Sequence, residues 1–266
     1  MSTKPLRIVS SSPAECYYSQ DMASVIAKNM NLLAHESKAL NLNLSSQQLN
    51  LFGLYQKELL RWNSRFNLTA INEPSEVQRL HFLDSLTVLM ALPPHVSSGT
   101  RVVDVGTGAG FPGIPLKIIC KNMQLTLVES TMKKVAFLKY LIGILGLNDV
   151  EIYRGRAEEA CHDINLREGF DIVLARGLAP LRTLAELTLP FCKLGGVVIA
   201  HKKGDLSLEI ARAKGAIDAM GGSIKKIWPI KLNSLSDDRV LLAISKEKAT
   251  PSQYPRRSGI PSKKPI

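Results

Sequence analysis

The stretch VVDVGTGAGFPGIPL, residues 102–116, joins a short β-branched run to a loop that holds four glycines and two prolines. Glycine is needed where the backbone must turn sharply or where a ligand lies directly against the main chain. The run before the loop has the composition of a buried strand and ends around Asp104. We therefore expect a strand whose carboxyl end opens into a bare loop that binds a nucleotide-like cofactor.

The sequence around this stretch predicts an open α/β sheet. Short β-branched runs alternate with helical patterns, which is typical of a mainly parallel sheet. The seven runs are RVVDV (101–105), LTLVES (125–130), VEIYRG (150–155), FDIVLAR (170–176), GGVVIAHK (195–202), IKKIWPI (224–230) and RVLLAIS (239–245). The loop between the last two is too short for a helical crossover, so these strands should pair antiparallel. The expected fold is Rossmann-like, with seven strands, six of them parallel and one a reversed edge strand.

The chain divides into four predicted parts. Residues 1–44 show no strong packing pattern and should form a loose extension. Residues 45–98 have helical spacing that starts at a pair of serines, and they should form a small helical cap. Residues 99–246 make the predicted α/β domain. Residues 247–266 carry four prolines and five basic residues, which predicts an extended basic arm.

Composition limits the environment of the protein. The sequence has no apolar run long enough to span a membrane and no apolar secretory segment in its first thirty residues. The cysteines lie too far apart for a zinc motif or a dense disulfide framework, and they are Cys16, Cys120, Cys161 and Cys192. We expect a cytoplasmic protein with no metal site, no membrane contact and no stable protein partner.

The net charge of +11 comes mostly from residues 101–246 and from the last twenty residues. Such a field attracts a polyanion and speeds its encounter with the protein. The charge therefore favours a nucleic acid partner, and a solvated basic surface is the alternative.

The glycine loop permits two interpretations. Gly108, Gly110 and Gly113 spell G-x-G-x-x-G, the pattern of nicotinamide dinucleotide sites. However, a carboxylate at Asp104 would repel a diphosphate and would suit an ammonium group. The two prolines of the loop also remove amide donors that a diphosphate needs. The arrangement instead resembles the S-adenosylmethionine site of class I methyltransferases, although a dinucleotide site and a plain tight turn remain alternatives.

A more specific resemblance covers the chain from about residue 45 to its end. The motifs are WNSRFNLTAI (62–71), HFLDSL (81–86), the glycine loop, ESTMKKVAFL (129–138), GRAEE (155–159), ARGLAPL (175–181), LPFCKLGG (189–196) and YPRRSGIPSKKPI (254–266). Together they resemble the bacterial RsmG (GidB) family. The resemblance implies a class I methyltransferase domain behind a helical cap, and methyl transfer from S-adenosyl-L-methionine to N7 of one guanine in 16S ribosomal RNA.

The family pattern implies a set of site residues. Those expected to bind the cofactor are Asp104, Gly106, Gly108, Gly110, Phe111, Glu129, Arg156, Ala157, Glu158 and Arg176. Glu129 would accept hydrogen bonds from the ribose hydroxyls, and a solvent-facing helix cap is its alternative role. Those expected at the reacting centre are Arg176, Asn67 and His81. Those expected to contact RNA are Lys202, Lys203, Arg239, Arg256 and Arg257.

An N7 target fits the residues present. Guanine N7 carries a lone pair and no proton, so attack on a sulfonium methyl needs no general base. His81 is accordingly expected to be a hydrogen-bonding group. Enzymes that methylate exocyclic amines need an NPPY-like motif after the fourth strand, where this chain has ARGL. Enzymes that methylate pyrimidine C5 need a nucleophilic cysteine, and Cys192 is expected to be buried and inert.

The end of the fourth predicted strand should face the substrate. Arg176 lies there, at the mouth of the crevice of an open α/β sheet, and could stack on a base or hold a phosphate. A salt bridge that ties down the strand end is its alternative role, and a solvated loop is the alternative for Lys202 and Lys203. Two rival functions are a nicotinamide-dependent oxidoreductase and a non-catalytic RNA-binding assembly factor.

Overall fold

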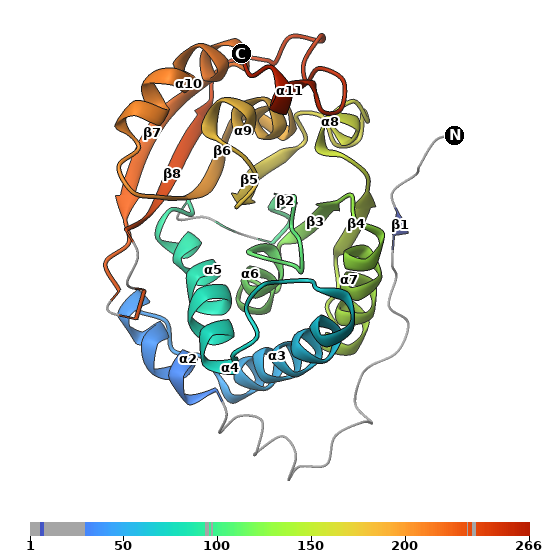
Figure 1. Ribbon diagram of the computed structural model, residues 1–266, viewed down its shortest axis with the longest axis vertical. Coiled ribbons are helices and arrows are strands. Elements are labelled where there is room, and N and C mark those ends of the chain that lie inside the picture. Colours follow the sequence, from blue (N-terminus) through green and yellow to red (C-terminus); the bar gives the residue numbers. More distant parts are fainter. Residues whose placement is uncertain (1–5, 8–29, 94–95, 97, 233, 236–237) are drawn as a thin grey trace.

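One mixed sheet organises the protein, whose computed structural model describes residues 6–7, 30–93, 96, 98–232, 234–235 and 238–266 (Figure 1). The strand order is β1-β4-β3-β2-β5-β6-β8-β7. The strands are β1 (Leu6–Arg7), β2 (Arg101–Val105), β3 (Gln124–Glu129), β4 (Val150–Arg154), β5 (Phe170–Arg176), β6 (Cys192–Lys203), β7 (Gly222–Pro229) and β8 (Arg239–Lys246). All seven predicted strands are present, and the α/β class is confirmed.

The position of the reversed strand differs from the prediction. β8 pairs antiparallel with both β6 and β7, so it lies one place inside the edge, and β7 forms the edge. The reason is burial: Leu241 and Leu242 of β8 are fully buried on opposite faces, whereas Lys225 and Lys226 of β7 are exposed. Lysines suit a sheet edge because they disfavour pairing with another chain. At the other edge, the two-residue β1 adds an unpredicted eighth strand, antiparallel to β4.

Helices cover both faces of this sheet (Figure 1). One layer contains α6 (Gly113–Ile119) and α7 (Met132–Leu145), and the other contains α8 (Ala157–Ala160), α9 (Leu181–Thr188) and α10 (Ser207–Ala219). Neighbouring strand residues such as Val102 and Val103 are buried against opposite layers. Both faces are covered, which explains why the strands are continuous apolar runs in the sequence. Within the described residues, no helix has the length and apolarity needed to cross a membrane.

The helical cap packs against the first layer. Its main helix is α3 (Ser46–Phe66), which starts at a capping box in which the Ser45 hydroxyl accepts from the Gln48 amide. The second predicted helix starts at Pro74 and changes type along its length. Its segments are α4 (Pro74–Glu76), a π-helical turn (Val77–Leu83), α5 (Asp84–Leu86) and a 3-10 turn (Thr87–Met90).

The cap extends further towards the N-terminus than predicted. Residues 30–44, assigned by the sequence to a loose extension, include α2 (Asn31–Glu36) and a 3-10 turn (Ser37–Leu40). Met30 and Leu33 are fully buried, and the Leu33 amide donates to the Gln78 side chain at 3.1 Å. Burial of these apolar side chains holds the segment on the cap. The rest of the predicted extension, apart from β1, lies outside the described residues.

The C-terminal residues 247–266 do not form the extended arm that their composition predicts. They fold back over α8 and α9 and include the short helix α11 (Ile260–Lys263) (Figure 1). Pro255 and Pro261 are buried in this contact. Proline lacks an amide donor and has a fixed φ, so it is a rigid apolar residue that can be buried without an unpaired N–H group.

Candidate active site

The glycine loop has a backbone that only glycine adopts readily. Gly106, Gly108 and Gly110 have φ angles of 69°, 64° and 107°, in a region that L-residues rarely occupy. A Cβ atom on Gly106 would lie 2.6 Å from the Leu178 side chain, and one on Gly110 would lie 2.7 Å from the Tyr55 hydroxyl. The loop is therefore bare because of both its conformation and its close neighbours.

Asp104 stabilises this loop by hydrogen bonds. Its Oδ2 atom accepts from the Thr107 hydroxyl at 2.6 Å and from the Gly113 amide at 2.8 Å. The side chain is fully buried, and its Oδ1 atom is without a hydrogen-bond partner among the described residues. Burial raises the pKa of Asp104 to about 6, although the two hydrogen bonds oppose that rise. A buried carboxylate oxygen that lacks a donor is suited to a cationic ligand.

Glu129 supports the loop from the next strand. It ends β3, and its carboxylate accepts from the Gly108 amide at 3.0 Å and from the Thr131 amide at 2.7 Å. The side chain is almost fully buried. Glu129 therefore does not face solvent as a helix cap would, and hydrogen bonds hold both of its carboxylate oxygens beside the loop.

The helical cap contacts the loop through aromatic residues, of which the sequence analysis missed Tyr55. The Tyr55 hydroxyl on α3 donates to the Ala109 carbonyl at 2.6 Å. The Phe111 ring stacks with the Tyr55 ring at 5.2 Å and with the His81 ring at 4.3 Å. A tyrosine on the apolar face of a predicted helix was a usable signal, because a buried phenol needs a hydrogen-bond partner. Phe111, predicted to bind the cofactor, is itself buried in this cluster.

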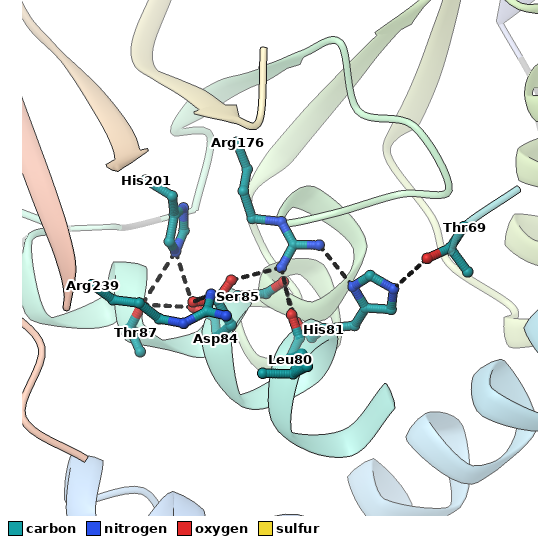
Figure 2. Close-up of polar contacts among 9 residues, drawn as sticks. All are labelled: Thr69, Leu80, His81, Asp84, Ser85, Thr87, Arg176, His201 and Arg239. Carbon is teal, nitrogen blue, oxygen red and sulfur yellow. Dashed lines mark hydrogen bonds and ion pairs between the residues drawn. The ribbon is translucent and has the colours of Figure 1, made fainter. Parts of the chain in front are cut away.

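Arg176 joins the end of β5 to the cap (Figure 2). Its Nη1 donates to the Leu80 carbonyl at 2.9 Å and to Asp84 Oδ2 at 2.7 Å. Its Nη2 donates to His81 Nδ1 at 2.8 Å, and its guanidinium lies over the Phe111 ring at 5.2 Å. The salt bridge considered as its alternative role is thus present. The same guanidinium also lines the cleft described below.

The hydrogen bonds of His81 define its protonation state. An arginine can only donate, so Nδ1 of His81 must carry the lone pair. Its Nε2 lies 2.8 Å from the Thr69 hydroxyl and carries the proton. Burial, followed by the charge of Arg176, lowers the pKa of His81 to about 3. The ring is therefore neutral at physiological pH and is a poor proton carrier.

Asp84 is the centre of the polar cluster in Figure 2. In addition to Arg176 it pairs with Arg239, whose Nη1 lies 2.6 Å from Oδ1. Burial would raise the pKa of Asp84, but the neighbouring basic groups outweigh burial and lower it. The Asp84 carbonyl accepts from His201 Nε2 at 2.9 Å, and burial lowers the pKa of His201. Asp84 of the cap thus binds the ends of three strands, β5 and β8 through its carboxylate and β6 through its backbone carbonyl.

A cleft of about 490 Å³ opens beside this cluster. It lies at the carboxyl ends of β5 and β6, where ligands bind in open α/β sheets. Its wall includes the loop after β5, residues 177–179. Leu178 in that loop is the residue nearest to Gly106. The cleft therefore adjoins the glycine loop, and a substrate in it would lie next to a ligand on the loop.

Three predicted RNA contacts lie at or near this cleft. Lys202 and Lys203 line it, but Lys202 Nζ is 2.6 Å from Glu209 Oε1, so its charge is paired. Lys203 is exposed. Arg239 lines the cleft and pairs with Asp84, as described above.

The two predicted contacts in the tail lie elsewhere. Arg256 forms a bidentate ion pair with Glu186, which is fully buried. That pair binds the tail to α9, so the guanidinium of Arg256 is used in folding, contrary to its assignment to an extended basic arm. Arg257 is exposed.

Asn67 is not among the residues that line the cleft. It is the exposed C-cap residue of α3 and adopts the left-handed conformation, with φ 49°. Asparagine tolerates that conformation better than most residues, which accounts for its presence there without a catalytic role.

The cofactor-binding residues predicted after β4 lie at the start of α8. Arg156 is exposed and precedes the helix, whereas Ala157 and Glu158 are buried. Glu158 Oε1 accepts from the Gly259 amide of the C-terminal segment at 2.8 Å.

Cys192 starts β6 and is buried, and burial raises the pKa of its thiol to about 12. As predicted, that cysteine is unsuited to be a nucleophile.

Comparisons with known proteins identify the family. The sequence profile of GidB, described as rRNA small subunit methyltransferase G, matches residues 48–233. A protein named ribosomal RNA small subunit methyltransferase G from Dehalococcoides mccartyi is 46% identical over 237 residues, which cover 89% of this chain and all of that protein. Its namesake from Lactobacillus johnsonii is 40% identical, over 90% of this chain and all of that protein.

A solved structure supports the fold alone. A crystal structure of a mutant of MtNAS aligns with a TM-score of 0.51 at 16% identity, and covers 88% of this chain and all of that one. The sequence relatives carry the identification, because they cover 89% and 90% of this chain and the family profile matches residues 48–233. The chain therefore belongs to the rRNA small subunit methyltransferase G family.

Proposed function

We propose that this protein transfers a methyl group from S-adenosyl-L-methionine to N7 of one guanine in 16S ribosomal RNA. Membership of the family makes it a ribosomal RNA methyltransferase that uses S-adenosylmethionine. The observation that carries the proposal is the contact of Gly106 with Leu178, which places the bare loop next to the cleft at the ends of β5 and β6.

The loop fits the proposed cofactor. S-adenosylmethionine has an ammonium group, and the buried Oδ1 of Asp104 lacks a donor. Its ribose has two hydroxyls, and the Glu129 carboxylate is held at the end of β3. The three positive-φ glycines leave the main chain open to close approach. Beyond β4, Ala157 and Glu158 would lie at the adenine end. When bound, the cofactor supplies a sulfonium methyl group for in-line transfer.

The residues around the cleft would orient the guanine rather than exchange protons with it. N7 attacks with its own lone pair, so alignment and exclusion of water are the main contributions of the protein. His81 is neutral and bonded on both ring nitrogens. Arg176 lies between the cap and the glycine loop and presents a fixed guanidinium to the cleft. A flat cation of this kind can stack on a base or hold a flanking phosphate.

The substrate must present N7 outside a regular helix. The major groove of A-form RNA is deep and narrow, so side chains reach N7 only in loops or after the base is extruded. We propose that 16S ribosomal RNA, either free or in a partly assembled small subunit, is the substrate and that the protein acts in the cytoplasm. Lys203, Arg239 and Arg257 would contribute to salt-dependent affinity for the phosphates.

Methyl transfer to ribosomal RNA tests the proposal directly. Small-subunit RNA from cells that lack the gene is incubated with the protein and labelled S-adenosylmethionine, and its nucleosides are separated and analysed by mass spectrometry. We expect label in 7-methylguanosine at a single site that is unmodified in the mutant cells. Label at an exocyclic nitrogen would contradict the N7 assignment. Binding of RNA without release of S-adenosylhomocysteine would support the assembly factor, and binding of NADH would support the oxidoreductase.

A further inference from the structure

The C-terminal segment, residues 250–266, is docked by many contacts from the second helical layer. Thr183 donates to the Pro261 carbonyl at 3.0 Å. Arg182 donates to the carbonyls of the last two residues. Arg167 donates to three further carbonyls, those of Thr250, Pro251 and Tyr254. These side chains together satisfy backbone carbonyls along the whole segment, and so many bonds fix the path of its main chain.

An ion pair anchors the middle of this segment. Glu186 on α9 is fully buried and accepts from the backbone amide of Arg256 at 2.8 Å and from its Nε and Nη2 atoms at 2.9 Å and 2.6 Å. A buried carboxylate is stable only when its partners are in place. Undocking of the segment would leave Glu186 without its charge partner, so the docked state is strongly favoured.

Between Arg256 and the start of α11, the docked segment passes against α8. The Gly259 amide donates to Glu158 Oε1 at 2.8 Å, and the Ser258 hydroxyl donates to Glu159 Oε1 at 3.1 Å. Gly259 has a φ of 83°, and a Cβ atom built there would have no neighbour within 4 Å. The position therefore requires glycine for its backbone conformation and not for space. That conformation aims the amide at Glu158.

We propose that the C-terminal segment is a structural part of the cofactor site, in which Gly259 positions Glu158 for the adenine end of S-adenosylmethionine. This inference rests on the proposed function, because it takes Glu158 as an adenine contact. Glu158 is buried, and the Gly259 amide occupies one of its two oxygens. The carboxylate is therefore already oriented before the ligand binds. The entropy cost of ordering it then does not reduce the binding free energy. Gly259 acts through Glu158 and is a positioning residue.

The test compares two glycines that have the same backbone requirement. Gly259→Ala and Gly146→Ala each place an L-residue at positive φ with open space around it. Gly146 ends α7 just before β4 begins, so it lies towards the amino ends of the strands, whereas the glycine loop follows the carboxyl end of β2. Titration calorimetry with S-adenosylhomocysteine should show about fivefold weaker binding for Gly259→Ala and no change for Gly146→Ala. Gly259→Pro also removes the amide donor and should weaken binding further, by about tenfold or more.

A kinetic readout separates positioning from loss of fold. In Gly259→Ala we expect a raised KM for S-adenosylmethionine, an unchanged kcat at saturation, and a Tm within the range of the Gly146→Ala control. Wild-type affinity in Gly259→Pro, or tighter binding in either Gly259 variant, would overturn the inference. Failure of the proposed function is distinguishable, because in that case the wild-type protein itself would not bind S-adenosylhomocysteine.

Discussion

Arg176 and Asp84 join the end of β5 to helix α5 of the cap through an ion pair of 2.7 Å between Nη1 and Oδ2. Asp84 is 1% exposed and Arg176 is 17% exposed, so the pair is shielded from solvent and is screened only weakly. Residues that are 92 positions apart in the sequence thus form one wall of the cleft. The shape of the cleft therefore depends on this ion pair.

Replacement of Arg176 should separate cofactor binding from turnover. Arg176→Ala leaves Asp84 with one arginine, and we expect unfolding free energy to fall by about 2 kcal/mol. The guanidinium beside the cleft is lost, so kcat should fall at least about 100-fold, while the affinity for S-adenosylhomocysteine should stay within about threefold. Denaturant unfolding, calorimetry and methyl transfer measure the three effects. Lys193→Ala, which breaks an exposed ion pair with Asp171, is the control. A large loss of cofactor affinity would contradict the substrate role.

Removal of the Tyr55 hydroxyl should weaken the glycine loop. Tyr55→Phe leaves the Ala109 carbonyl without its donor, and we expect a loss of about 1 kcal/mol in unfolding free energy. The affinity for S-adenosylhomocysteine should fall with it, because the loop loses its contact with the cap. Tyr140→Phe removes a hydroxyl from α7, at a position that packs on Trp62 rather than on the loop, and should leave the affinity unchanged. Equal affinity in both variants would show that the hydroxyl does not support the loop.

Asp104 should make the protein less stable as the pH rises. Burial raises its pKa to about 6 from 3.8 in the unfolded chain. The folded state therefore retains a proton that the unfolded state has lost, and stability falls between about pH 4 and pH 6. The whole effect is about 3 kcal/mol. Asp104→Asn removes this ionisation, so the unfolding free energy of the variant should stay level across that range while that of the wild type falls. The same variant should bind S-adenosylmethionine more weakly, because the carboxylate for its ammonium group is lost.

The pH dependence of turnover should show no ionisation of His81. Burial and Arg176 lower its pKa to about 3, so the folded protein keeps a neutral ring above that value. We expect kcat at saturating substrates to be level between pH 6 and pH 8. An acidic limb near pH 6.5 that disappears in His81→Gln would show instead that this histidine carries a proton.

Asn67 should be replaceable by glycine but not by alanine. Both residues remove the side chain amide, and only glycine adopts the left-handed C-cap conformation freely. We expect Asn67→Gly to keep kcat within about twofold and stability within about 0.5 kcal/mol. Asn67→Ala should lose about 1 kcal/mol of stability. If Asn67→Gly were folded and inactive, the catalytic role predicted from the family pattern would be restored.

Local sequence was sufficient for the strands and for the bare glycine loop. The alternation of β-branched runs with helical patterns predicted seven strands, because period and composition reflect burial within a few residues. The glycines predicted a bare loop for a similar reason, because positive φ, which three of the four adopt, is a property of single residues. Even the inert Cys192 followed from its apolar surroundings.

Tertiary structure decided which charges are available. Arg176, Arg256 and Lys202 have the same formal charge as exposed arginines and lysines in the sequence. Arg176 and Arg256 are paired with Asp84 and Glu186, which are 92 and 70 positions away along the chain. Lys202 is paired with Glu209, seven positions away on the helix that follows β6. An ion pair depends on distances in space, and no local pattern encodes those distances. The predicted basic arm is therefore a docked segment.

The position of β8 also shows which features local sequence determines and which depend on tertiary structure. The sequence determined that two strands follow each other and pair antiparallel, since a short loop permits nothing else. Whether the last strand lies at the edge or inside it depends on which strand buries more apolar surface against the helices of both layers. The buried area of each strand depends on the whole sheet, so it is defined only in the folded chain.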